Sequence, residues 1–441
     1  MSFPRYPEYK NSGVEWLGEV PGHWEIERLK RSTLCAKNGV WGDEAQQDEN
    51  DIPCVRVADF DRQALRVQLS GPTIRNVIAR ERVGRVLMQG DLLLEKSGGG
   101  EGQPVGCVVL YDDPLPAVCS NFVARVQPAP DMDSSFWRYV HAAAYAVRIN
   151  TRSIKQTSGI QNLDASQYFD ERAGFPPLSE QTQIAAFLDR ETAKIDALVA
   201  EQRRLMALLK EKRQAVISHA VTRGLNPHAP MKPSGIEWLG DVPKHWKVMP
   251  AKRISSVFVP QRNKPDLNAD GEGHFWVTME QMRSEEINSA ELSVTESAAR
   301  DAGTRVLSAG SVIASCVGTF GLAAINNVDV IINQQLQAFI PTDRIDAKFM
   351  RHCVVIAEGY FEQIGTAATI AYVNQLGFAN MPMVLPPKVE QHQIVEFLAI
   401  ESAKFDTLTA EAQRAIDLLQ ERRTALISAA VTGQIDVRGA V

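Results

Sequence analysis

The chain has 441 residues, of which 44% are hydrophobic and 23% charged, and its formal net charge at pH 7 is −6. This length predicts at least two domains, and the composition is typical of a folded globular protein rather than a disordered one. The acidic balance excludes a protein that coats nucleic acid indiscriminately through a large positive field, although a local basic groove on such a chain can still bind DNA.

Targeting and metal signals are missing from the sequence. No apolar run approaches the roughly 18 to 20 residues that span a bilayer, and the N-terminus lacks the charged-then-apolar layout of a secretion signal. The six cysteines lie far apart and form no C-x-x-C pair, which predicts reduced thiols and no metal site. We therefore expect a cytoplasmic protein with no membrane contact.

A tryptophan-rich phrase opens the chain and recurs at its middle. Residues 12–24 read SGVEWLGEVPGHW and residues 234–246 read SGIEWLGDVPKHW, so ten of thirteen positions are identical. A repeat of this kind predicts a frame that is built twice. Because both copies contain the histidine, packing or capping suits His23 and His245 better than catalysis, and we expect Trp16 and Trp238 to pack equivalently.

The two longer stretches that follow the phrases read as mixed structure. Short β-branched runs bounded by Gly and Pro predict strands at residues 90–97, 106–112, 122–128, 310–316 and 329–341. Helical stretches are predicted at residues 136–149 and 348–364. Each stretch has the size of an ordinary domain, and α+β is the predicted class.

Each half then ends in a segment with a heptad pattern. Both segments follow a Pro-Pro pair, open with Glu-Gln, and meet a glycine, Gly224 or Gly433, where a helix would stop. A single helix has no core of its own, so its apolar stripe must be buried against another part of the protein. We expect the two helices to bury their stripes on each other; the alternative is that each lies on its own globular domain. The positions expected in the helix-helix core are Ile184, Leu188, Ile195, Leu198, Leu205, Leu209, Val216, Ile394, Leu398, Phe405, Leu408, Leu419 and Leu426.

This layout divides the chain into seven segments. They are an N-terminal frame segment (1–24), a first body (25–175), a first helix (176–223), a linker with the second frame copy (224–246), a second body (247–385), a second helix (386–433) and a tail (434–441).

Known catalytic motifs do not appear. The glycine-rich run at residues 95–106 places Lys96 and Ser97 before its glycines, whereas a phosphate-binding loop needs them after. The sequences FPPL and LPPK share only their Pro-Pro pair with the motif of adenine methyltransferases, because they lack both the leading amide or acid and the aromatic ring. A flexible loop is the simpler interpretation of the glycine run, and contact with a phosphate or base edge is the alternative.

The repeated phrase, together with PPLSEQTQIAAFLD at Pro176 and PPKVEQHQIVEFLA at Pro386, resembles the specificity subunit of type I restriction-modification systems. The resemblance covers essentially the whole chain and the order of its parts. It implies two target recognition domains of mixed α/β structure, joined by two long antiparallel coiled-coil helices in a pseudo-twofold internal repeat. Each domain would read one half of a split double-stranded DNA site, and the helices would set the spacer.

The same resemblance implies the partners and cofactors. Such a subunit has no catalytic activity and binds no cofactor directly. It docks two modification (methyltransferase) subunits that use S-adenosylmethionine to methylate adenine. The complex can then recruit restriction subunits, two in number, that use ATP and Mg.

Polar runs that lie opposite one another in the two bodies are the candidates for DNA contact, because Arg, Lys, Asn, Gln, Ser and Thr read base edges in the major groove. For any one of them taken alone, ordinary loop or strand polarity is the simpler explanation. These candidates are Lys96, Ser97, Gln103, Ser120, Asn121, Arg152, Lys155, Gln156, Ser315, Thr319, Asn333, Gln334 and Gln335.

Two other functions remain open from the sequence. The first is a methyltransferase or nuclease that reads DNA by itself, which the missing cofactor motif disfavours. The second is a structural coiled-coil adaptor that binds no DNA.

Overall fold

The computed structural model of the protein describes residues 3–156, 159–366 and 371–439. By their contacts the residues form two units. Unit 1 combines Met1–Gln202 with Gln413–Val441, and unit 2 is Arg203–Ala412. The division therefore falls inside the two long helices.

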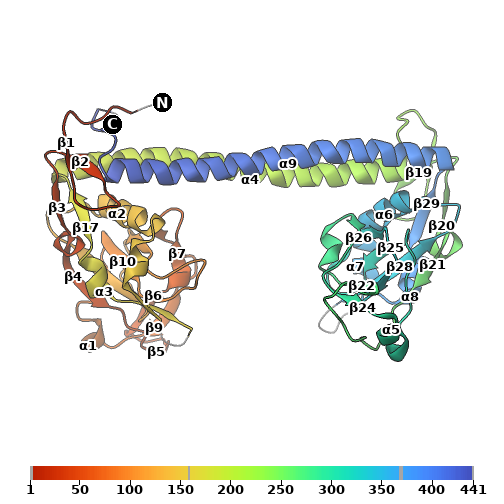
Figure 1. Ribbon diagram of the computed structural model, residues 1–441, viewed down its shortest axis with the longest axis horizontal. Helices are drawn as coiled ribbons and strands as arrows, with labels where there is room; N and C mark the ends of the chain where they lie inside the picture. Colours follow the sequence, from red (N-terminus) through yellow and green to blue (C-terminus); the bar gives the residue numbers. More distant parts are fainter. Residues whose placement is uncertain (1–2, 157–158, 367–370, 440–441) are drawn as a thin grey trace. The chain divides into compact units, whose positions relative to one another are not determined.

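The core of unit 1 is a six-stranded sheet with the order β4-β14-β10-β12-β8-β7 (Figure 1). Its strands are β4 (Thr33–Asn38), β7 (Phe60–Asp61), β8 (Arg66–Val67), β10 (Asp91–Glu95), β12 (Val108–Tyr111) and β14 (Val123–Pro128). The central strand β10 pairs antiparallel with β12 and β14, and all of its side chains are buried. Helix α2 (Ser134–Ala146) covers one face, because its Phe136 and Trp137 pack in one cluster with Leu92 and Leu94.

Smaller sheets complete unit 1. One has the order β13-β6-β9-β5, a second β11-β16-β15, and β17-β3 and β1-β2 form two-stranded ribbons. The bounds of these strands and of the short helices are β1 (Tyr9–Asn11), β2 (Glu19–Pro21), β3 (Glu25–Arg28), β5 (Asp43–Glu44), β6 (Asp51–Val55), β9 (Thr73–Asn76), β11 (Ser97–Gly98), β13 (Val118–Cys119), β15 (Ile154–Gln156), β16 (Gln161–Leu163), β17 (Arg172–Phe175), α1 (Ala79–Arg82) and α3 (Ala165–Phe169).

Unit 2 has a main sheet of five strands with the order β21-β28-β25-β26-β23. A second sheet has the order β24-β22-β27, and β20-β29 and β18-β19 are ribbons. The bounds are β18 (Met231–Pro233), β19 (Asp241–Pro243), β20 (Lys247–Pro250), β21 (Ser255–Phe258), β22 (His274–Val277), β23 (Glu286–Ile287), β24 (Ser293–Val294), β25 (Val312–Ser315), β26 (Ala323–Asn326), β27 (Val330–Ile332), β28 (Leu336–Pro341), β29 (Pro382–Leu385), α5 (Glu296–Ala302), α6 (Ala347–Ile356), α7 (Glu358–Ile364) and α8 (Gln375–Asn380). Here β25 is the central strand, paired antiparallel with β26 and β28.

Mixed helix and sheet in both units confirm the predicted α+β class. Two predicted elements differ from the structure. The strand predicted at residues 329–341 is two strands, β27 and β28, because the Asn333 carboxamide accepts a hydrogen bond from the Gln335 amide at 3.1 Å and turns the chain. The helix predicted at residues 348–364 is broken at Ala357, where ψ reaches 12° between α6 and α7.

Helices α4 (Leu178–Arg223) and α9 (Lys388–Val431) are the long segments predicted from the heptads. Each is followed by a glycine with positive φ, 75° at Gly224 and 73° at Gly433, which a helix end commonly requires. A side chain would also clash there: a Cβ on Gly433 would lie 2.2 Å from the Pro21 ring. No helix in the described part of the chain is both long enough and apolar enough to cross a membrane.

Within each unit, one end of α4 packs against the opposite end of α9. In unit 1, Ile184 and Leu188 of α4 share a buried cluster with Ile427 and Val431 of α9. In unit 2, Ile217 and Val221 of α4 share a buried cluster with Ile394 and Leu398 of α9. The helix segments are therefore antiparallel inside each unit, and they pack on the body of the same unit as well as on each other.

Three residues assigned to the helix-helix core are exposed, and these predictions were wrong. Leu198 is 53% exposed, Leu205 42% and Leu408 46%. In α4 the buried residue that follows Ile195 is Val199, four positions later, which is 1% exposed. Leu198, three positions after Ile195, points to solvent instead. The other predicted positions are buried or partly buried: Ile184, Leu188, Ile195, Leu209, Val216, Ile394, Leu398, Phe405, Leu419 and Leu426.

A buried histidine makes the stability of unit 1 dependent on pH. His141 of α2 is 2% exposed, its Nδ1 lies 2.8 Å from the Tyr168 hydroxyl, and burial lowers its pKa from 6.5 to about 4. The unfolded chain therefore binds a proton that the folded unit does not. The neutral, buried His141 therefore costs the folded unit nothing at pH values above 6.5. As the pH decreases towards 4, the free energy of unfolding of unit 1 is expected to fall by about 3 kcal/mol. Denaturant unfolding between pH 7 and 4 measures this loss, and His141→Asn should make the profile flatter, whereas the same substitution at exposed His228 should not.

Candidate nucleic-acid interface

A buried carboxylate joins the repeated phrase of unit 1 to helix α4. Glu180, in the first turn of α4, is 5% exposed. Its Oε1 accepts hydrogen bonds from the Tyr6 hydroxyl at 2.6 Å and from Trp24 Nε1 at 3.0 Å, and its Oε2 lies 2.8 Å from His23 Nε2. Trp24 is fully buried. The Trp-rich phrase therefore fixes the start of the long helix to the body.

Unit 2 contains the corresponding contacts in a more open form. Glu390 accepts from Trp246 Nε1 at 2.9 Å and lies 2.7 Å from His245 Nε2, with 34% of its side chain exposed. The expectation that Trp16 and Trp238 pack equivalently was wrong in one respect. Trp16 Nε1 donates to the Arg172 carbonyl at 3.1 Å, whereas Trp238 Nε1 is buried and has no hydrogen-bond partner within residues 3–156, 159–366 and 371–439.

The glutamine that follows each of these glutamates fixes the helix on the main sheet. Gln181 Oε1 accepts from the backbone amide of Asp133, the N-cap of α2, at 3.0 Å. Gln391 Oε1 accepts from the amide of Asp346, the N-cap of α6, at 2.7 Å. The Pro-Pro-x-x-Glu-Gln pattern is thus the connection between long helix, phrase and sheet in each unit.

Three predicted DNA-contacting residues of unit 1 meet at one pocket. Ser97, Ser120 and Asn121 line a pocket of about 490 Å³ at the end of the central strand β10. Two aromatic residues, Trp41 and Phe122, also line it and are 37% and 48% exposed. Exposed rings and amide groups around a concavity of this size are typical of a binding site.

The charged candidates on the neighbouring small sheet have partners. Ser97 and Lys155 both stand opposite Asn162, on β11 and β15 respectively, so the three lie in a row across the sheet. The Ser97 hydroxyl donates to Asn162 Oδ1 at 2.6 Å, and Lys155 pairs with Asp164 at 2.7 Å. Arg152 lies 3.6 Å from Glu15 and 3.7 Å from Glu171. For Gln156 the structure describes only the backbone, which pairs with Gln161.

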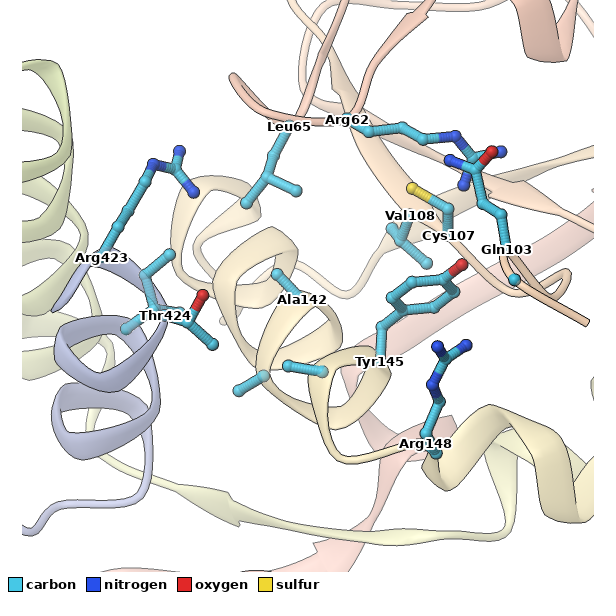
Figure 2. A pocket seen from close by; sticks show the side chains of 14 residues that line it. Arg62, Leu65, Gln103, Cys107, Val108, Ala142, Tyr145, Arg148, Arg423 and Thr424 are labelled. Atoms are coloured by element: carbon cyan, nitrogen blue, oxygen red, sulfur yellow. The ribbon is translucent and has the colours of Figure 1, made fainter. Parts of the chain in front are cut away.

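Gln103 does not join the other candidates. It lines a second pocket of unit 1, about 360 Å³, whose walls also include Arg423 and Thr424 of α9 (Figure 2). The Tyr145 hydroxyl of α2 donates to the Pro104 carbonyl at 2.7 Å and ties the glycine loop down there. The loop predicted to act as one contact therefore serves two pockets, with Ser97 at the first and Gln103 at the second.

In unit 2 the candidates gather at the corresponding end of the main sheet. Ser315 ends the central strand β25 opposite Leu336, the first residue of β28. The turn before β28 is Asn333, Gln334 and Gln335, and the Cys316 amide donates to the Gln335 carbonyl at 2.9 Å. Gln334 Nε2 donates to the carbonyls of residues 261 and 262, at 2.9 and 3.2 Å, and Thr319 is exposed just beyond the strand.

Burial changes the acidity of two groups at the end of β10. It lowers the pKa of the Lys96 ammonium. It also raises the pKa of the Glu95 carboxyl, against the opposing effect of Arg62, whose Nη2 donates to Glu95 Oε1 at 2.8 Å.

Comparison with known proteins gives similarity to one family. Residues 243–416 match the model of the type I restriction modification DNA specificity domain. Two curated relatives from Methanocaldococcus jannaschii align over nearly the whole chain. The type I restriction enzyme MjaVIII specificity subunit is 22% identical, covering 95% of this chain and 94% of the relative; the putative MjaX specificity subunit is 19% identical, covering 96% of each. The chain is therefore similar to specificity subunits of type I restriction enzymes over nearly its whole length, and residues 243–416 match the DNA specificity domain of that family.

The fold agrees with that of solved members of the family. A chain from a structure of a type I R-M system, described by its complex assembly and conformational transition, has a TM-score of 0.67 at 16% identity, covering 93% of this chain and 98% of that one. The HsdS subunit from Thermoanaerobacter tengcongensis has a TM-score of 0.51 at 15% identity, covering 96% and 98%.

Several residues of the candidate interface were missed from the sequence. Trp41 and Phe122 had no motif to mark them, and only their joint exposure at a pocket distinguishes them from core aromatics. Glu95 was quoted as part of the glycine-rich run but was not assigned a role. Its position as the last residue of a buried strand, directly before that loop, was the available signal.

Proposed function

We propose that this specificity subunit reads a bipartite double-stranded DNA site, with the body of each unit recognising one half. The observation that carries the proposal is the position of the polar candidates. In each unit they gather where the central strand of the main sheet ends and the turn before its neighbour begins: Ser97, Ser120 and Asn121 in unit 1, and Ser315, Asn333 and Gln334 in unit 2. Because these turns differ in sequence, the two half-sites differ too.

We further propose that α4 and α9 form one antiparallel coiled coil with pseudo-twofold symmetry, which sets the spacer between the half-sites. Two ion pairs between equivalent residues support it. Arg423 of α9 donates to Asp196 of α4 at 3.1 Å in unit 1, and Arg213 of α4 donates to Asp406 of α9 at 2.6 Å in unit 2. Residues 213 and 423 are related by the same offset of 210 as residues 196 and 406, as a twofold repeat requires.

Both arginines also reach the body of their own unit. Arg423 donates to the Gln63 carbonyl in unit 1, and Arg213 donates to Glu285 at 3.3 Å in unit 2. These arginines therefore hold both long helices against the body of the same unit. A spacer function needs such a fixed connection between helices and body.

The partners and chemistry belong to the same proposal. The chain itself is non-catalytic and docks two methyltransferase subunits, which carry S-adenosylmethionine. Restriction subunits that use ATP and Mg complete the complex. The names of the curated relatives, which are specificity subunits, support this assignment.

Methylation mapping tests the function. Genomic DNA from cells that express the chain with its methyltransferase is expected to carry methyladenine in a split motif with an undefined middle. The chain alone, incubated with DNA, Mg and S-adenosylmethionine, should neither methylate nor cleave. Activity of the isolated chain would instead favour a self-contained enzyme, and absence of any duplex binding in the complex would favour a structural adaptor.

A further inference from the structure

One acceptor atom at the unit 1 pocket has no donor. Glu95 lines the pocket formed with Ser97, Asn121 and Phe122, and its side chain is 1% exposed. Its Oε1 accepts from Arg62, but its Oε2 is buried and has no hydrogen-bond partner among the residues that the structure describes. A buried carboxylate oxygen without a donor is costly, so a group that donates a hydrogen bond to it binds favourably.

The walls of the pocket suit a flat, aromatic occupant. Phe122 and Trp41 expose their rings there. One face of Trp41 is covered by the Arg75 guanidinium, 4.5 Å from the ring centroid, which fixes the indole in position. Asn121 is exposed beside Phe122 and supplies an amide that can both donate and accept. Unstacked nucleobases are bound by this combination of aromatic faces and amide groups.

The depth of Glu95 restricts how a base can reach it. A base that remains in the stack of a duplex offers only its edge, and a carboxylate with 1% of its side chain exposed lies too deep for that edge. A base turned out of the stack presents its whole edge to the floor of the pocket. Carboxylates accept hydrogen bonds from exocyclic amines, and an unstacked cytosine, adenine or guanine presents such an amine whereas thymine has none.

We propose that this pocket receives an unstacked cytosine, adenine or guanine of the first half-site, with Glu95 Oε2 accepting a hydrogen bond from its exocyclic amino group. The inference rests on the proposed DNA-reading function and specifies how unit 1 carries it out. Unit 2 has serine, Ser315, at the equivalent end of its central strand, and its hydroxyl is also buried, with no partner in the described part of the chain. A short hydroxyl in place of a carboxylate makes this mode of reading specific to unit 1.

The test uses the full-length chain assembled with its methyltransferase subunits and a library of randomised duplexes. Once the split motif is selected, each adenine of the first half-site is replaced by purine, each cytosine by pyrimidin-2-one and each guanine by hypoxanthine, which lack only the amino group. At one position this deletion is expected to weaken binding about ten- to a hundredfold. In Glu95→Gln the same deletion should have no effect, because Arg62 holds the one remaining oxygen and an NH2 group, which only donates, replaces Oε2.

Two further variants separate reading from folding. Glu101→Gln removes the same charge from the exposed glycine loop without lining the pocket, and it should bind as the unmodified chain does. Phe122→Ala removes a largely exposed ring and should weaken binding of the first half-site. A general loss of structure in Glu95→Gln would lower affinity at all positions of that half-site, not at one. The second half-site remains as an internal measure of intact protein.

The outcomes distinguish this inference from the function on which it rests. If no split motif is selected at all, the proposed function is wrong. If a motif is selected but every amino-group deletion affects Glu95→Gln and the unmodified chain equally, only the pocket inference is overturned. If the base in the pocket is adenine, the thymine opposite it is expected to react with permanganate. Protection of that thymine in the complex would contradict unstacking.

Discussion

Replacing Glu180 by alanine is expected to lower the free energy of unfolding of unit 1 by about 3–5 kcal/mol. The substitution leaves the Tyr6 hydroxyl and the Trp24 indole, both buried, without their acceptor. His23 loses its partner at the same time. Chemical denaturation followed by circular dichroism measures the change, with the transition of unit 1 moving to lower denaturant concentration.

The equivalent substitution in unit 2 is the matched control. Glu390→Ala is expected to cost only about 1–2 kcal/mol, because that carboxylate is one third exposed and water can replace it at Trp246 and His245. The phrase in unit 1 also contributes Tyr6, whose pKa is raised by burial and by its bond to Glu180. If both substitutions lower the free energy of unfolding by the same amount, the buried hydrogen bonds of Glu180 add nothing to the stability of unit 1.

Lengthening both long helices by 21 residues is expected to preserve DNA binding, whereas lengthening them by 14 should reduce it about a thousandfold, to the non-specific level. Both insertions are whole heptads, placed after Gln202 of α4 and Ala412 of α9, so the buried stripe continues. At about 1.5 Å per residue, 21 residues add roughly 31 Å, close to one turn of DNA. The selected motif should then have the same half-sites with a gap about nine base pairs longer.

The shorter insertion is the informative control. Fourteen residues add roughly 21 Å, or about six base pairs, which turns the second half-site towards the opposite side of the duplex. Selection from randomised duplexes measures both variants. If the 14-residue variant binds the original motif with unchanged spacing, the helices do not set the distance, and the spacer role has to be abandoned.

The spacing of apolar residues and the positions of Gly and Pro in the sequence predicted the main elements. The ends of α4 and α9 follow from Pro-Pro pairs and from Gly224 and Gly433, which act locally. The register of the buried stripe did not follow in the same way. Leu198 and Val199 are adjacent and both apolar, and only the packing partner selects Val199 for burial.

The candidate interface was predictable in part for a similar reason. Ser97, Ser120 and Asn121 come from segments more than 20 residues apart, and their polarity near strand ends was visible in sequence. The separation of Gln103 from Ser97 was not, because it depends on the contact between Tyr145 of α2 and the loop carbonyl at Pro104. Glu95 and Arg62 were missed because their pairing joins strand β10 to the turn between β7 and β8, which lies 33 residues away in sequence.

The composition of unit 1 has a consequence for how the chain folds while it is being made. Residues 413–441 supply Ile427, Val431 and Val437 to the core that contains Trp24, and the Asp436 amide donates to the Pro4 carbonyl at 2.8 Å. Unit 2, by contrast, is one continuous stretch of chain. All residues of unit 2 are therefore synthesised before the last residues of unit 1. Unit 1 begins to be synthesised first but is completed last, and until then part of its apolar surface stays uncovered.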